Sequence, residues 1–151
     1  MAFLDARTSA NATEQGQLNI PVTDVYEIFG QIGLSLSGAT GSTPIRVQMD
    51  GTFVVQNDPS LPSSVLVEVL VVRGLDSKDP VVYRDFLQIL PPADPSQDIF
   101  ITQYSFSAAD FNVPSGGPAI YTAFIRVPDG TDPNLITRIG PENFNGLANN
   151  G

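Results

Sequence analysis

Glycine and proline interrupt this sequence at short intervals along its length, and this feature limits the possible folds more than any other. The 151 residues contain thirteen of each, many of them in turn-forming clusters such as PPADPSQD and PSGGP. Proline and glycine both disfavour helix interiors, whereas short strands joined by turns accommodate them readily. The spacing therefore predicts an all-β chain.

The segments between these turns have strand-like patterns. In IRVQMDGTFVV, Ile45 to Val55, apolar residues alternate with polar ones, which is typical of a strand with one wet face. Val65 to Arg73 is apolar on both faces except at Glu68, which indicates a central strand or one packed beneath a neighbouring subunit. Further strands are expected at Val81 to Leu90, Ile99 to Phe106, Ala119 to Val127 and Leu135 to Ile139.

The first strand-like run is QLNIPV, and the next stretch, PVTDVYEIFGQIGLSLSG, fits either a helical stripe or a strand. We expect a loop or short turn there, followed by a strand. Counting from Gln17 gives about eight short strands, so residues 17–151 are predicted to form one jelly-roll-like β-sandwich, with an immunoglobulin-like topology as the alternative. No repeat of solenoid or propeller length is present.

Charge and residue usage exclude several functions. Sixteen acidic and seven basic residues give a net charge of -9, and the cations are scattered, so we expect no nucleic-acid partner. Cysteine and histidine are absent, which removes catalysis and metal binding that depend on them. No run is long and apolar enough for a membrane span. We therefore expect no enzyme activity, no cofactor and no membrane partner.

Three short motifs have plain structural interpretations. GATGST, Gly38 to Thr43, lacks the lysine and helix of a phosphate loop and is expected to be a turn without nucleotide. Asp129, Asp132 and Asn134 could gather oxygen ligands for calcium, but they lack the EF-hand spacing, and a solvated turn is favoured. SAAD, Ser107 to Asp110, resembles a capping box and predicts one helical turn in a loop.

The first 16 residues, MAFLDARTSANATEQG, remain to be explained. Their apolar cluster is too short for a secretory signal. One interpretation is a disordered tail; the other is a connector arm, which when extended would reach about 50 Å and could add a strand to a neighbouring subunit. The residues expected to make these contacts are Phe3, Leu4, Arg7, Thr8, Ala10 and Ala12. A second subunit contact is possible on the apolar face formed by Leu66, Leu70 and Val72, with burial under a loop as the alternative.

The chain resembles the exosporium and endospore-appendage subunits of spore-forming Bacilli. The resemblance covers most of the chain and rests on DART near the start, then LNIPV, FGQIGLSL, IRVQMDGT, VLVEVLVVRG, VVYRDFLQI and ITRIGPENFNG in that order. Members of that family often cross-link through cysteines in their connector, and this chain has none. Fibres of this chain would therefore depend on strand insertion and packing alone, or the chain represents a cysteine-free branch or a related exosporium component.

The resemblance implies a jelly-roll subunit that polymerises with copies of itself into an extracellular fibre on the spore surface, without a classical signal peptide. It also implies a spore-surface anchor or tip protein as a further partner. A structural protein of a phage or virus, such as a decoration, tail or fibre component, is the main alternative. A carbohydrate-binding jelly-roll module is the third, although the chain has no Trp and only four Tyr.

Overall fold

The computed structural model describes residues 2–39, 43–94, 96, 100–128, 132 and 134–151. Throughout this part of the chain the regular elements are strands, which confirms the predicted all-β class. The ten strands are β1 (Ala2–Ala12), β2 (Ile20–Pro21), β3 (Glu27–Leu34), β4 (Ile45–Asn57), β5 (Val65–Arg73), β6 (Val81–Ile89), β7 (Phe100–Phe111), β8 (Ala119–Arg126), β9 (Ile136–Arg138) and β10 (Glu142–Asn150). None of the described residues forms a helix with the length and apolar character needed to cross a membrane.

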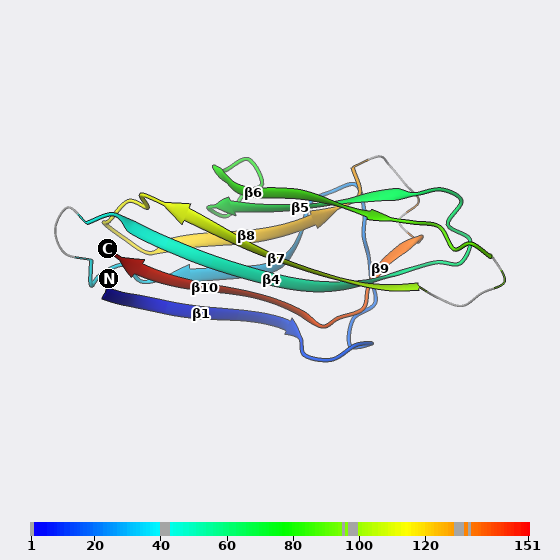
Figure 1. Cartoon of the computed structure of the whole chain (residues 1–151), viewed down its shortest axis with the longest axis horizontal. Coiled ribbons are helices and arrows are strands. Elements are labelled where there is room, and N and C mark those ends of the chain that lie inside the picture. Colours follow the sequence, from blue (N-terminus) through cyan, green and yellow to red (C-terminus); the bar gives the residue numbers. More distant parts are fainter. Residues whose placement is uncertain (1, 40–42, 95, 97–99, 129–131, 133) are drawn as a thin grey trace.

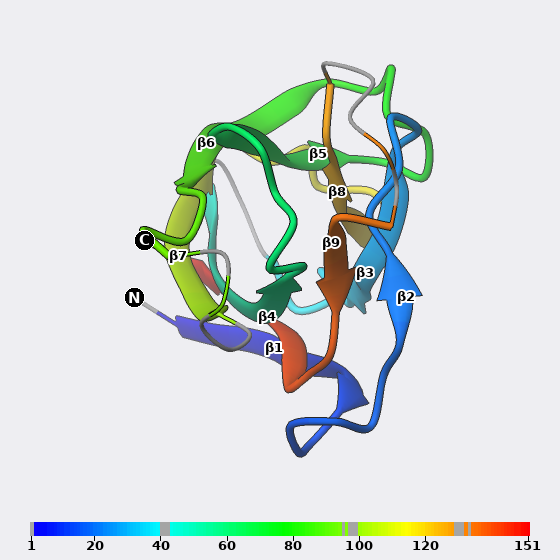
Figure 2. The same ribbon diagram turned by 90° about the vertical axis from the view of Figure 1, so that its right-hand side faces the viewer.

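The strands form two antiparallel sheets. In the first sheet β1 pairs with β10, β10 and β9 pair with successive parts of β4, β2 pairs with β9, and β7 pairs with β4 along almost its whole length. The second sheet has the order β3-β8-β5-β6. The strands run along the long axis of the molecule (Figure 1), and the view turned by 90° shows them surrounding a common interior (Figure 2).

The core lies between the sheets and is built from the alternating positions of their strands. Val67, Val69 and Val71 of β5 are fully buried on the side that faces the first sheet, opposite Val47 and Phe53 of β4. These β-branched and aromatic side chains suit a pleated surface that is covered on its inner face. The predicted β-sandwich is therefore confirmed.

Most of the strands expected between the turns are found close to their predicted bounds. β4 extends the expected Ile45 to Val55 strand by two residues, and β5 matches Val65 to Arg73. The ambiguous stretch contains a loop followed by β3, as expected, whereas only Ile20 and Pro21 of QLNIPV form a strand.

Two segments differ from the sequence prediction. Ser107 to Asp110, expected as a helical turn, lies in the second half of β7, where antiparallel pairing with β4 holds it extended. The prediction was wrong because the ladder satisfies the backbone groups that a capping box would otherwise serve. The run ENFNGLANN was not expected to be a strand, yet it forms β10 between β1 and β4.

Candidate functional site

Within the N-terminal arm, residues 1–16, the segment Ala2–Ala12 forms the outermost strand of the first sheet in this structure. Its strand β1 pairs with β10 of the same chain through nine antiparallel residue pairs, from Ala2 opposite Asn150 to Ala12 opposite Glu142. Figure 1 shows β1 lying along β10 at the margin of the sheet. The predicted extended arm is therefore an edge strand, and its partner within the chain is β10.

The residues expected to make arm contacts differ in burial. Phe3 is 67% exposed at the tip of the arm, while Leu4 is half-buried and packs against the core. Ala12, at the other end of β1, is 5% exposed. Arg7, Thr8 and Ala10 are exposed. Contacts of these residues with a second chain remain a prediction.

Polar side chains of β1 bond to the backbone of β3, the facing edge strand of the second sheet, and of Ser35, the residue that follows it. The backbone N–H of Ser35 donates to Asp5 Oδ2 at 2.8 Å, and that of Gln31 donates to Ser9 Oγ at 3.3 Å. The side-chain Nδ2 of Asn11 donates to the carbonyl of Phe29. An edge strand with unpaired backbone groups is open to pairing with other chains, so β1 covers this edge with side chains instead of a ladder.

Asp5 is the charged member of this group. Its carboxylate also accepts from the backbone N–H of Ala6 at 2.9 Å and from Arg7 Nε at 3.1 Å. The bond from Ser35 is the largest of the effects that lower the pKa of Asp5 below its usual value, with smaller contributions from the bonds to Ala6 and Arg7. The ionised form of Asp5 therefore favours the arm in its present position.

The sequence beneath the arm permits a close approach of β3 and β10. A side chain on Gly30 of β3 would overlap the Cβ of Phe144 in β10, so this crossing requires glycine. Phe144 is fully buried at the same crossing and pairs with Ser9 of the arm. The arm thus lies over a position where the two sheets come together.

A turn at residues 13–17 links β1 to the rest of the chain. Gln17 Oε1 accepts from the backbone N–H of Thr13 at 2.8 Å and of Glu14 at 3.2 Å. Gly16, with φ 85°, donates its N–H to the carbonyl of Ile139 at 2.8 Å. Gly140, with φ 80°, has no room for a side chain, because one would lie 2.8 Å from the carbonyl of Glu14. The turn is therefore the hinge on which any movement of the arm would depend.

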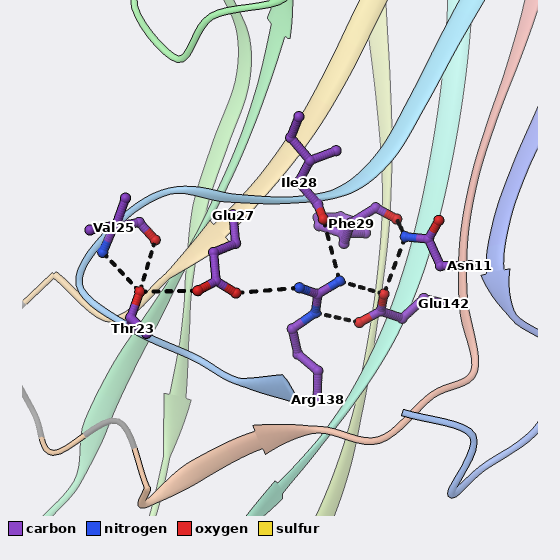
Figure 3. Close-up of polar contacts among 8 residues, drawn as sticks. All are labelled: Asn11, Thr23, Val25, Glu27, Ile28, Phe29, Arg138 and Glu142. Carbon is purple, nitrogen blue, oxygen red and sulfur yellow. Dashed lines mark hydrogen bonds and ion pairs between the residues drawn. The ribbon is translucent and has the colours of Figure 1, made fainter. Parts of the chain in front are cut away.

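A buried ion pair lies beside the hinge end of β1 (Figure 3). Arg138 and Glu142 form two hydrogen bonds of 2.6 Å, and their side chains are 3% and 0% exposed. Glu27 Oε2 lies 3.5 Å from Arg138, and Asn11 Nδ2 donates to Glu142 Oε2 at 3.4 Å. Asn11 thus joins the arm to both β3 and this pair, and none of these polar partners was identified from the sequence.

A sequence signal for this site exists. In the arm the residues Asp5, Arg7, Ser9 and Asn11 are polar at every second position, which is the period of a strand face. The intervening residues Ala6, Thr8 and Ala10 are small. The alternation could therefore have indicated that the face with Asp5, Ser9 and Asn11 meets another backbone. What the sequence could not supply was the identity of that backbone.

The second predicted contact face is mostly buried within the chain. Leu70 and Val72 are 0% exposed on the outer side of β5, where they cluster with Phe124 beneath Tyr26. Leu66 is 39% exposed. Only Leu66 of these three residues therefore offers surface to a neighbour in this structure.

The possible calcium ligands and the glycine-rich turn fall partly outside the described residues. Asp129 and part of GATGST are not described. Asp132 Oδ1 accepts from both N and Nδ2 of Asn134 at 2.9 Å, which closes the turn with its own side chain. Across the described ranges, no cluster of three or more acidic side chains is placed to hold a metal ion.

No protein-family model matches the chain, and no curated protein matches its sequence.

Proposed function

We propose that the protein is a structural subunit that assembles with copies of itself into a fibre by exchanging its N-terminal arm. The arm of one copy would leave its own groove and occupy the same groove, between β10 and β3, in the next copy. The observation that carries this proposal is the way β1 is held: mainly by a backbone ladder and polar side chains. Among Ala2 to Ala12 only Ala12 is buried, and Leu4 is half-buried against the core.

Exchange is energetically inexpensive for such a strand. Every bond that β1 forms with β10 and β3 is re-formed in the second copy, as in domain swapping. Because little apolar surface of the arm is buried, a displaced arm exposes few apolar groups while it searches for a new partner. The hinge at residues 13–17 is the segment that must change conformation.

The exchanged-arm contact is directional, as a fibre requires. Each copy gives one arm and receives one, so the giving and receiving surfaces differ and the contact is heterologous. Such contacts generate open filaments when the rotation between copies does not close a ring. Strand addition of this kind is a general mode of peptide recognition at sheet edges.

The winding of the strands supports the proposed jelly roll. Successive strands alternate between the two sheets from β2 to β5, and again from β6 to β9. Two stacked antiparallel sheets connected in this way are expected of a jelly roll, which is common in subunits of large assemblies. Together with the resemblance to spore-appendage subunits, this favours an extracellular spore-surface fibre, held by a surface anchor or tip protein, without a cofactor or catalytic role.

A phage or virus particle is the other assembly in which such a subunit would serve. The arm and groove do not separate the two settings, because both use open, repeated contacts. Expression timed to sporulation would favour the spore fibre, whereas neighbouring terminase or portal genes would favour the particle.

Deletion of residues 1–16 tests the proposal. The shortened chain should retain its β-sheet circular dichroism and remain monomeric, while the full chain forms fibres visible by negative-stain microscopy. A matched control replaces Ser115 and Ser63, exposed residues outside the arm, with alanine and should assemble normally. Fibres of ordinary appearance from the shortened chain would refute arm exchange.

A further inference from the structure

Three side chains of the arm bond to backbone groups on the β3 side of the groove, and they do so in a single antiparallel register. The bonded pairs are Asp5 with Ser35, Ser9 with Gln31 and Asn11 with Phe29. Steps of four and then two residues along the arm are matched by steps of four and then two residues in the opposite direction along the other segment. The groove therefore contacts the arm at defined positions.

The three positions require different chemical groups. At positions 5 and 9 the groove presents a backbone N–H, so the arm must supply an acceptor. At position 11 the groove presents the carbonyl oxygen of Phe29, so the arm must supply a donor. A shift of the arm by two residues in either direction would place Arg7, which has donors and no acceptor, at the N–H of Ser35 or of Gln31. The pattern therefore disfavours a shifted register.

Position 11 also lies beside a buried group of charges (Figure 3). Arg138, whose side chain is 3% exposed, pairs with the fully buried Glu142 at 2.6 Å and with Glu27 at 3.5 Å. Among the residues that the structure describes, both acids form their ion pairs with Arg138 alone. Two carboxylates on one guanidinium leave an excess of negative charge, and burial makes a further negative charge beside Glu142 costly.

Asn11 meets this group with its amide nitrogen. Nδ2 donates to the carbonyl of Phe29 and to Glu142 Oε2, the latter at 3.4 Å. If the amide were turned around, its oxygen would face two oxygens, so the two acceptors fix which end of the side chain points inward. Aspartate has the same shape but carries only oxygens. At position 11 it would lose both bonds and bring a third carboxylate to the charge group.

We propose that the groove selects the arm of a second copy by register and by charge, and that position 11 is its main specificity position, where a neutral donor is favoured and an acid is excluded. This selection rests on the proposed function and adds to it the means by which a receiving copy recognises an arm. In a chain with sixteen acidic and seven basic residues, it also keeps acidic segments of other copies out of the groove.

Competition between two arms tests the selection in full chains. Donor chains carry Ala6→Cys, and half of them, labelled with ¹⁵N, also carry Asn11→Asp. Receiver chains carry Leu147→Cys, which faces position 6 in the register of β1 and β10. The chains are mixed during assembly and oxidised, and mass spectrometry measures which donors are disulfide-linked to receivers. The unchanged arm should be captured at least about tenfold more often, as expected for the loss of a hydrogen bond to a charged group.

The matched control for this competition is Ala10→Asp. It adds the same charge one residue away, at an exposed position on the other face of β1, and should be captured as often as the unchanged arm. Equal capture of the Asn11→Asp arm and the unchanged arm would overturn the selection. Equal exclusion of the Ala10→Asp arm would also overturn it, because the effect would then belong to the charge of the arm and not to position 11.

Hydrogen exchange tests the same selection for the arm in its own groove. At concentrations below assembly, the β1 amides should exchange at least about tenfold faster in Asn11→Asp than in Asn11→Ala, because the acid adds repulsion to the loss of the bonds. Glu27→Gln removes one of the two acidic charges at a partly exposed position and should reduce this difference. Equal exchange in the two variants, or a difference that Glu27→Gln leaves unchanged, would overturn selection by charge.

The two proposals fail in different ways. If neither arm is linked to a receiver, arm exchange fails, and the hydrogen-exchange series decides the selection at position 11. If both arms are linked equally, arm exchange stands and the selection fails.

Discussion

Strands β1 and β5 are both fully formed, yet they are held in place by different forces. β5 lies between β8 and β6, and its Val67, Val69 and Val71 are fully buried against the first sheet while Leu70 and Val72 are fully buried on the other face. β1 fully buries only Ala12, with Leu4 half-buried against the core, and is joined to its surroundings mainly by the β10 ladder and by hydrogen bonds of its polar side chains. Burial fixes β5, whereas hydrogen bonds within the chain are the main contacts that hold β1.

The difference teaches which part of a sheet can be shared between molecules. Removing β5 would expose a continuous apolar surface and open the core. Removing β1 would expose mainly backbone donors and acceptors of β10 and β3, which water can satisfy in part and another arm can satisfy fully. A strand of the second kind suits reversible assembly.

Leu70→Ala should produce the largest effect on stability. Removing this fully buried side chain from β5 is expected to lower the free energy of unfolding by about 2–5 kcal/mol, because the neighbours cannot fill the space completely. Urea unfolding followed by circular dichroism measures the loss. If Leu70→Ala lowers the free energy of unfolding by less than a substitution in the arm does, β5 is not held more strongly than β1.

Asn11→Ala should lower the free energy of unfolding less than Leu70→Ala does, but it should reduce the hydrogen-exchange protection of the arm more. Its Nδ2 bonds the Phe29 carbonyl and Glu142, so its loss should lower the free energy of unfolding by about 0.5–1.5 kcal/mol. Hydrogen exchange should speed up in β1 while the amides of β5 keep their protection. Uniform acceleration across both strands would indicate that the arm and core open together.

Acid should loosen the arm selectively. The pKa of Asp5 is lowered in the folded chain, chiefly by the bond from Ser35, so its stabilising contribution is present above its usual pKa of about 3.9. That contribution is lost as the pH falls through the lowered value. Hydrogen exchange of β1 should therefore show an acid-induced loss of protection that Asp5→Asn lacks. The same acid dependence in the variant would assign the effect to other carboxylates.

Phe3→Ala should have the smallest effect on the isolated chain. Phe3 is 67% exposed, and exposed substitutions usually change stability by no more than about 0.5 kcal/mol. Its thermal midpoint should match that of the unmodified chain at concentrations below assembly. A large drop in the thermal midpoint would mean that the Phe3 ring stabilises its own subunit. The contrast between an exposed arm and a buried core strand would then not hold.

The sequence predicted the strands that alternate regularly and missed those whose inner positions are polar or small. β4 was recognisable because its inward residues Val47, Met49 and Phe53 are apolar. β10 was missed because its buried positions include Glu142, Gly146 and Asn150, so the buried face shows no continuous apolar pattern. The burial of Glu142 is offset by its bonds to Arg138 and Asn11, and a sequence does not reveal such pairing.

The arm was predicted as an extended segment without its partner. Strand periodicity was visible in its polar positions, but pairing with β10 joins residues at opposite ends of the sequence. Its side-chain bonds to β3 depend on the close approach of two sheets at Gly30. Both sets of contacts form between segments that are distant in the sequence. The local residue pattern of the arm therefore could not predict the groove between β10 and β3.

A disulfide between β1 and β10 tests arm exchange most directly. Ala6 and Leu147 face each other in the register, and the chain has no cysteine of its own, so Ala6→Cys with Leu147→Cys introduces a single possible bond between these strands. Fibres are assembled, oxidised, dissolved in detergent and separated without reductant. Arm exchange predicts a ladder of covalent oligomers that collapses to monomer on reduction. Fibres that dissolve only into internally linked monomers would contradict it.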